Sequence, residues 1–136
     1  MKSELFWLAM SVALAIVQML VAAQGLFNKV GLAGMAGNRE GLPEMTGWAG
    51  RAARAHRNMI ENLVLFAAMS ATAVVWGRNN AMTLLGAQLF FYARLAYAVL
   101  YVAGVTWLRT LAWLVSMAGI VLILGTLLLW KAGPAS

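Results

Sequence analysis

The chain lacks cysteine altogether, and its 136 residues include only one histidine and four acidic residues. Without cysteine there is no disulfide, no thiolate nucleophile and no Cys-ligated zinc or iron–sulfur site. One histidine and four carboxylates are too few for a dedicated metal cage, so we expect no metal cofactor.

Charge is scarce as well: 10% of the residues are charged and 63% are hydrophobic, with a mean hydropathy of +0.81. Soluble domains carry about 25% charged residues, so this composition excludes a soluble globular protein and predicts an integral membrane protein. The net charge of +6 would suggest nucleic acid in a soluble protein. In a membrane protein, cytoplasmic loops rich in Lys and Arg explain the same excess, and we expect no nucleic-acid partner.

What the sequence does contain is four apolar runs, each near the ~20 residues that a transmembrane helix needs. The first run exceeds the h-region of a cleaved signal peptide, which has about 7–15 residues, so we interpret it as an uncleaved span. The sequence predicts an all-α, four-transmembrane-helix bundle in which residues 1–136 form a single membrane domain. The expected spans are about 5–27, 59–76, 81–104 and 108–130, and the expected cytoplasmic loop is 28–58.

The distribution of Lys and Arg predicts the orientation, because these residues accumulate on the cytoplasmic side. The long loop and the turn after the third span carry six of them, and the opposite face carries three. Both termini are therefore expected on the non-cytoplasmic side. The six are Lys29, Arg39, Arg51, Arg54, Arg57 and Arg109, and the three are Lys2, Arg78 and Lys131.

Polar residues inside or beside the spans are the candidates for function, because charged groups in a bilayer are costly and usually face a bundle interior. At helical spacing they form three stripes that the predicted topology brings to the cytoplasmic half. Arginine forks bind carboxylates and a carboxylate receives an ammonium, so the stripes suit a small anionic ligand that carries an amine. They are Arg51, Arg54, Arg57, Asn58, Glu61 and Asn62 on the second span, Arg94, Tyr97 and Tyr101 on the third, and Arg109, Thr110, Trp113 and Ser116 on the fourth.

Structural interpretations of the same residues stay open at this point. The arginines at the start of the second span are also what a positive-inside flank would contain. Glu61 and Arg94 would also serve as an ion pair that joins the second and third spans. The tyrosines and Trp113 would also serve as interface aromatics.

The run Arg54–Asn62, with the sequence RAHRNMIEN, resembles the second-helix signature of the MAPEG family, the membrane-associated proteins in eicosanoid and glutathione metabolism. Arg94 followed by Tyr97 and Tyr101, and then the run Arg109–Trp113, resembles that family's third-to-fourth-helix segment. The resemblance covers residues 5 to 130 and is strongest to small bacterial members of the microsomal glutathione transferase type. It implies a homotrimer in a membrane, here the bacterial inner membrane, that binds glutathione between subunits near the cytoplasmic side.

The resemblance also implies a role for each matching residue. Glutathione is then the co-substrate, and its polar parts are bound by Arg54, Arg57, Asn58, Glu61, Arg94, Tyr97 and Tyr101. Arg109 would face the thiol and Thr110 would donate a hydrogen bond to the sulfur. A guanidinium beside a thiol favours the thiolate, and arginine itself cannot act as the base. The implied reaction is attack of this thiolate on a hydrophobic electrophile, or on a lipid hydroperoxide, that arrives from the bilayer.

Two alternatives to this enzyme remain. Animal members of the family usually carry an arginine at the end of the first span, where this chain has Asn28 and Lys29, and its segment from Tyr101 to Arg109 is one residue shorter than in several relatives. These departures favour a non-catalytic lipid- or thiol-binding or scaffold protein of the same family. A small transporter is the third interpretation, although Glu61 lies near the cytoplasmic end and not at the midplane where proton-coupled carriers place an acid.

Overall fold

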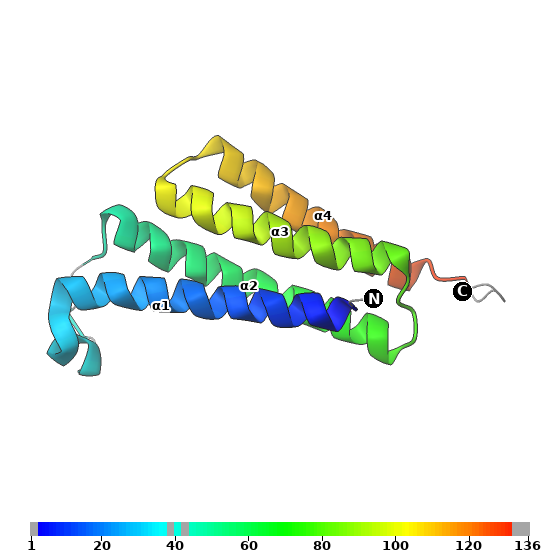
Figure 1. The fold of residues 1–136 in the computed structure, drawn as a ribbon, viewed down its shortest axis with the longest axis horizontal. Helices are drawn as coiled ribbons and strands as arrows, with labels where there is room; N and C mark the ends of the chain where they lie inside the picture. Colours follow the sequence, from blue (N-terminus) through cyan, green and yellow to red (C-terminus); the bar gives the residue numbers. More distant parts are fainter. Residues whose placement is uncertain (1–2, 38–39, 42–43, 132–136) are drawn as a thin grey trace.

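The computed structural model describes residues 3–37, 40–41 and 44–131, which contain four helices and no strand. They are α1 (Glu4–Ala36), α2 (Gly47–Val75), α3 (Ala81–Ala103) and α4 (Trp107–Leu128), and successive helices run antiparallel, so the described chain begins and ends at the same end of the bundle (Figure 1). Each helix is long and apolar enough to cross a membrane. The predicted all-α bundle of four membrane-spanning helices is confirmed.

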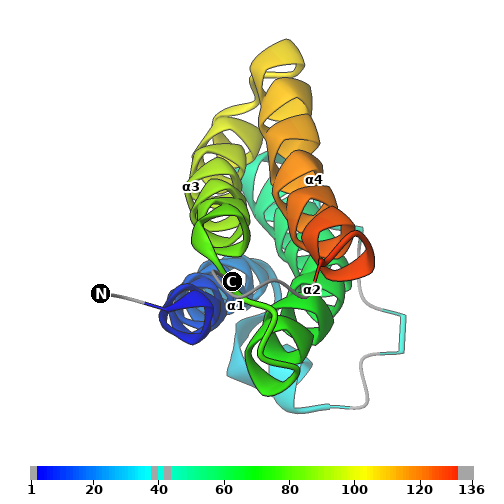
Figure 2. The same ribbon diagram turned by 90° about the vertical axis from the view of Figure 1, so that its right-hand side faces the viewer.

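The helices occupy the four corners of the bundle when it is seen along its length (Figure 2). The α2–α3 pair lies on one diagonal, and each of these two helices contacts α1 on one side and α4 on the other. Within the described residues α1 and α4 make no contact. Two separate spaces between helices result, one beside α1 and one beside α4.

The expected loop at 28–58 is mostly helical, and this prediction is corrected. The first helix continues to Ala36, with a break at Gly31 where φ is 71°, and α2 already begins at Gly47. A positive φ is readily adopted by glycine, which lets the end of α1 turn aside. The charged residues of α2 mark where the helix leaves its apolar part, but arginine is a good helix former and does not end it.

The bundle interior is packed through small residues and a few aromatic rings. Gly86 of α3 and Gly119 of α4 face each other so closely that a Cβ on either would lie 2.5 Å from the carbonyl oxygen of the other. Small residues of this kind let helix backbones approach in membranes. Phe66 of α2 stacks on Phe90 of α3 with 4.1 Å between ring centroids, and both rings are fully buried.

The α3–α4 connection is held against α2 by an arginine. The third helix ends at Gly104 with φ 85°, and the Nε of Arg51 donates a hydrogen bond of 3.0 Å to the carbonyl oxygen of Val102. The last carbonyls of a helix have no partner within it, so the guanidinium satisfies one of them. This contact fixes the start of α2 beside the end of α3, which is where the polar stripes meet.

Candidate functional site

A cavity of about 260 Å³ lies between α2, α3 and α4, near the α3–α4 turn. All three polar stripes contribute to its lining, so the expected convergence of the stripes is observed. The side chains that line this polar cavity are Asn58, Tyr97, Tyr101, Arg109, Thr110 and Trp113.

The turn between α3 and α4 places Arg109 next to Tyr101. Because Gly104 turns the chain back and α4 begins at Trp107, Arg109 lies in the first turn of α4, facing the end of α3. Its Cζ is 4.2 Å from the centroid of the Tyr101 ring. A guanidinium at this distance from an aromatic face is attracted by the ring quadrupole, so the Arg109 side chain is held at the cavity wall.

The same stack continues deeper along α3. The rings of Tyr97 and Tyr101 lie 5.5 Å apart between centroids, and the Cζ of Arg94 is 4.2 Å from the Tyr97 ring. Positions 94, 97 and 101 share one face of α3 because they are spaced by three and four residues. Two tyrosine rings are thus enclosed between two guanidinium groups, and the cavity wall carries positive charge.

Arg94 is the most unusual member of this stack. It is only 1% exposed, and none of its three guanidinium nitrogens has a hydrogen-bond partner in the described structure. The Glu61–Arg94 ion pair considered from the sequence is not formed, since Glu61 is exposed on α2. A buried charge without a partner is costly, so the described part of this protomer lacks the group that would balance Arg94.

Asn58, the lining residue that α2 contributes to the cavity, is oriented by Asn62 one turn further along the helix. The Nδ2 of buried Asn62 donates to the Asn58 carbonyl oxygen at 2.7 Å and to Asn58 Oδ1 at 3.0 Å. The amide of Asn58 consequently keeps one face toward the cavity while its oxygen is engaged on the other side.

The remaining predicted site residues of α2 do not line the cavity. Arg54, Arg57 and Glu61 are all exposed on the outer surface of this helix, and within the described residues none of them forms an ion pair. The single chain therefore brings five of the nine predicted site residues to the cavity and a sixth, Arg94, behind Tyr97, but leaves these three outside.

Three stripe residues have positions that the sequence did not distinguish. Trp113, which we placed on the third stripe without a binding role, lines the cavity. Arg51 caps α3 as described above, and the hydroxyl of Ser116 donates within its own helix to the Trp113 carbonyl oxygen at 2.6 Å. Helical spacing placed all three on the polar faces of their helices. It did not show which of them would line the cavity and which would form hydrogen bonds to the backbone.

The hydroxyl of Thr110 is partly engaged. Its Oγ1 donates to the Thr106 carbonyl oxygen at 3.2 Å, which is at the long end for a hydroxyl donor. A hydroxyl has one proton to donate, so Thr110 must rotate away from this carbonyl before it donates into the cavity. In the described part of the chain, no three His, Cys, Asp or Glu side chains lie together in a group that could bind a metal ion.

Comparison with known proteins connects this arrangement to one family. The sequence matches the model of the MAPEG family over residues 5–129. The match spans all four helices and every residue of the polar cavity. No curated protein and no solved structure matched the chain.

Proposed function

The chain belongs to the MAPEG family, and from this premise we propose that it is a membrane-bound glutathione transferase or peroxidase whose thiol chemistry takes place in the polar cavity. Membership makes it an integral membrane protein with a role related to glutathione or to eicosanoid metabolism. The specific reaction is our inference from the cavity.

The observation that carries the proposal is Arg109 at the wall of a cavity whose lining has no carboxylate. A free thiol titrates near pKa ~8.5, and a neighbouring cation lowers this pKa because it favours the anion. Arginine stays protonated at any accessible pH. A glutathione sulfur beside Arg109 would therefore be held as thiolate at neutral pH by electrostatic stabilisation.

The hydroxyls of the cavity would assist. Neither phenol of Tyr97 or Tyr101 has a hydrogen-bond partner within the described residues, whereas the Thr110 hydroxyl must first leave the Thr106 carbonyl. We therefore assign the readier hydrogen-bond donation to the sulfur to Tyr101, which stacks on Arg109, and a weaker one to Thr110.

The size of the cavity suggests that one protomer holds only part of the ligand. Sites for small molecules usually enclose about 300–1,000 Å³, and this cavity has about 260 Å³. The cysteinyl part of glutathione would occupy it, while the terminal carboxylates and the ammonium extend toward exposed Arg54, Arg57 and Glu61. In a homotrimer a neighbouring subunit would cover these residues, and a ligand carboxylate would pair with exposed Arg54 in bidentate fashion.

The chemical step balances without any further cofactor. The thiolate sulfur attacks the electrophilic carbon of a hydrophobic substrate, a C–S bond forms, and the leaving group departs with its electron pair. With a lipid hydroperoxide the sulfur attacks the terminal oxygen instead: an S–O bond forms, the O–O bond breaks, and the alkoxide takes up a proton and leaves as the alcohol. The thiol of a second glutathione then attacks the resulting sulfenic sulfur, which forms the disulfide and releases water. Either substrate would enter from the bilayer, where apolar molecules are concentrated.

The test is ultraviolet absorbance of the thiolate when glutathione is added to the purified, detergent-solubilised protein. We expect a signal at neutral pH that is lost in Arg109→Ala and kept in Lys131→Ala, which removes an exposed cation after the end of α4. An equal signal in Arg109→Ala would contradict the role of Arg109.

A second candidate is a non-catalytic binding protein of the same family. It is favoured by the end of the first span, where Asn28 accepts a hydrogen bond of 2.8 Å from Gln24 and no arginine is present. Glutathione binding by calorimetry without a thiolate signal in the wild type would support this candidate over the enzyme.

A further inference from the structure

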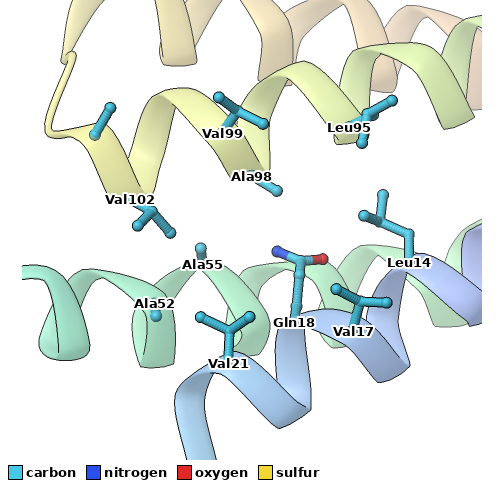
Figure 3. Close-up of a pocket in the computed structure, with 11 residues that line it drawn as sticks. Leu14, Val17, Gln18, Val21, Ala52, Ala55, Leu95, Ala98, Val99 and Val102 are labelled. Carbon is cyan, nitrogen blue, oxygen red and sulfur yellow. The ribbon is translucent and has the colours of Figure 1, made fainter. Parts of the chain in front are cut away.

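A second cavity, of about 450 Å³, lies on the other side of the α2–α3 pair, between α1, α2 and α3 (Figure 3). It shares no lining residue with the polar cavity. Its walls are apolar: Leu14 and Val21 come from α1, Ala55 from α2, and Ala98 and Val99 from α3. No charged side chain lines it, so it does not suit an anionic peptide such as glutathione.

One polar side chain interrupts these apolar walls. Gln18 of α1 is 8% exposed, and its Oε1 has no hydrogen-bond partner in the described structure. Figure 3 shows its amide projecting from α1 into the space between Ala55 and Ala98. A buried amide oxygen without a hydrogen bond in an apolar site is unfavourable, and within the described residues the cavity offers no donor to Gln18 Oε1.

The chemistry of the missing partner follows from the amide. It carries an acceptor oxygen and an NH₂ donor. A hydroxyl group both donates and accepts, so one hydroxyl satisfies Gln18 in either orientation of the amide. The rest of the partner must be apolar, because the other walls are aliphatic.

We propose that this apolar cavity is a second binding site, which takes from the bilayer a molecule with an alkyl body and one hydroxyl group. Its volume lies within the range of about 300–1,000 Å³ that small-molecule sites enclose. Two of its lining residues, Val17 and Val99, are 56% and 63% exposed on membrane-spanning helices, which gives the ligand an entry from lipid. The proposal does not depend on glutathione chemistry, since α3 separates the two cavities.

The experiment uses the full chain reconstituted in lipid nanodiscs. The probe is hexadecanol with a photoreactive diazirine in its chain, and the matched probe is the methyl ether of the same alcohol, which cannot donate a hydrogen bond. Crosslinks are located by mass spectrometry. We expect the alcohol to label α1 and α3 at the apolar cavity. Its half-saturating concentration should be about 5- to 10-fold lower than that of the ether, which is the effect expected of one buried hydrogen bond.

Variants decide whether the cavity and Gln18 are responsible. Gln18→Leu should raise the half-saturating concentration of the alcohol to that of the ether. Met19→Leu, which changes the exposed neighbour outside the lining, should leave this concentration unchanged. Val99→Trp, at an exposed lining position, should remove labelling by both probes. Circular dichroism and thermal unfolding of each variant show whether it is folded.

Each remaining outcome overturns the proposal. Equal half-saturating concentrations for alcohol and ether, or an unchanged concentration for the alcohol in folded Gln18→Leu, would mean that the Gln18 amide does not bind the hydroxyl group. Labelling that persists in folded Val99→Trp would place the site elsewhere, and failure of the alcohol to label would mean that a neighbouring copy or lipid chains already fill the space. None of these results depends on a thiolate signal, so they are distinguishable from failure of the glutathione proposal.

Discussion

The two cavities on either side of the α2–α3 pair differ in what forms them. The polar cavity beside α4 is lined by an arginine, two tyrosines and an amide, while the apolar cavity beside α1 is lined by alanines, valines and leucines around one glutamine. The same helix, α3, contributes to both, with Tyr97 and Tyr101 on one side and Ala98 and Val102 on the other. One helix thus separates the cavity that we propose for a thiolate from the cavity that we propose for an apolar alcohol, and substitutions on each side should act independently.

The largest expected effect is on the polar side. Arg109→Ala should lower kcat/KM for glutathione conjugation by about 100-fold, because one preorganised electrostatic partner of a developing anion is typically worth about 10²–10³. Steady-state kinetics with a hydrophobic chlorinated aromatic acceptor measure this. Binding of the hexadecanol probe to the apolar cavity should stay unchanged, and a parallel loss of both would mean that the two sides are not independent.

Arg94 is the next residue to test on the polar side, because its guanidinium is buried and has no hydrogen-bond partner in the described structure. An unpaired buried charge destabilises the fold, so replacing it by a hydrophobic residue of similar length removes that cost. We expect the Tm of Arg94→Met to stay the same or rise. If Arg94 holds the Tyr97 ring at the cavity wall, the Kd for glutathione should rise about tenfold in this variant. Thermal unfolding and calorimetry on the same variant separate the two effects, and a lower Tm with unchanged Kd would assign Arg94 to structure alone.

Glu61 tests whether the polar site extends beyond the protomer. It is exposed in the single chain, and exposed charge pairs contribute only about 0–1 kcal/mol. If a neighbouring subunit covers it and it binds the ammonium of glutathione, Glu61→Gln should raise the Kd about fivefold, with Glu44→Gln, another exposed acid, as the control. An unchanged Kd would remove Glu61 from the site.

The smallest expected effect concerns the hydrogen bond that holds the start of α2 against the end of α3. Arg51→Met removes the hydrogen bond to the Val102 carbonyl oxygen and should lower the free energy of unfolding by about 1 kcal/mol. The kcat/KM of the folded fraction should fall less than threefold, since Arg51 does not line either cavity. A loss comparable to that of Arg109→Ala would mean that Arg51 takes part in the reaction as well as in holding α2 against α3.

Much of the polar side was predictable because charge is rare in this chain. Only a few polar residues interrupt the apolar runs, and helical spacing groups them without knowledge of the tertiary fold. Arg94, Tyr97, Tyr101 and Arg109 therefore stood out from the sequence, and the structure stacks them as one row. Their roles toward glutathione stay predictions.

The apolar side was not predictable, because alanine and valine are common in any membrane helix and carry no pattern of their own. Gln18 interrupts the first apolar run and belongs to none of the three polar stripes. Gln18 becomes a candidate binding residue only because it lines a cavity between three helices and its oxygen has no hydrogen-bond partner in the described structure. The helical extensions that replace the expected loop were missed for a related reason, since polarity marks the edge of the apolar layer and not the end of a helix.

Four membrane-spanning helices, and the few residues that carry charge into them, follow from the order of residues alone, because burying apolar residues in lipid and keeping charges out of it are local requirements of each segment. Which of those residues come into contact depends on the packing of the helices. Arg51 and Arg109 have the same side chain, and both lie near the α3–α4 turn, yet one reaches a carbonyl oxygen and the other a tyrosine ring and a cavity. That distinction depends on how neighbouring helices are placed across the bundle, and no local rule of spacing or polarity contains it.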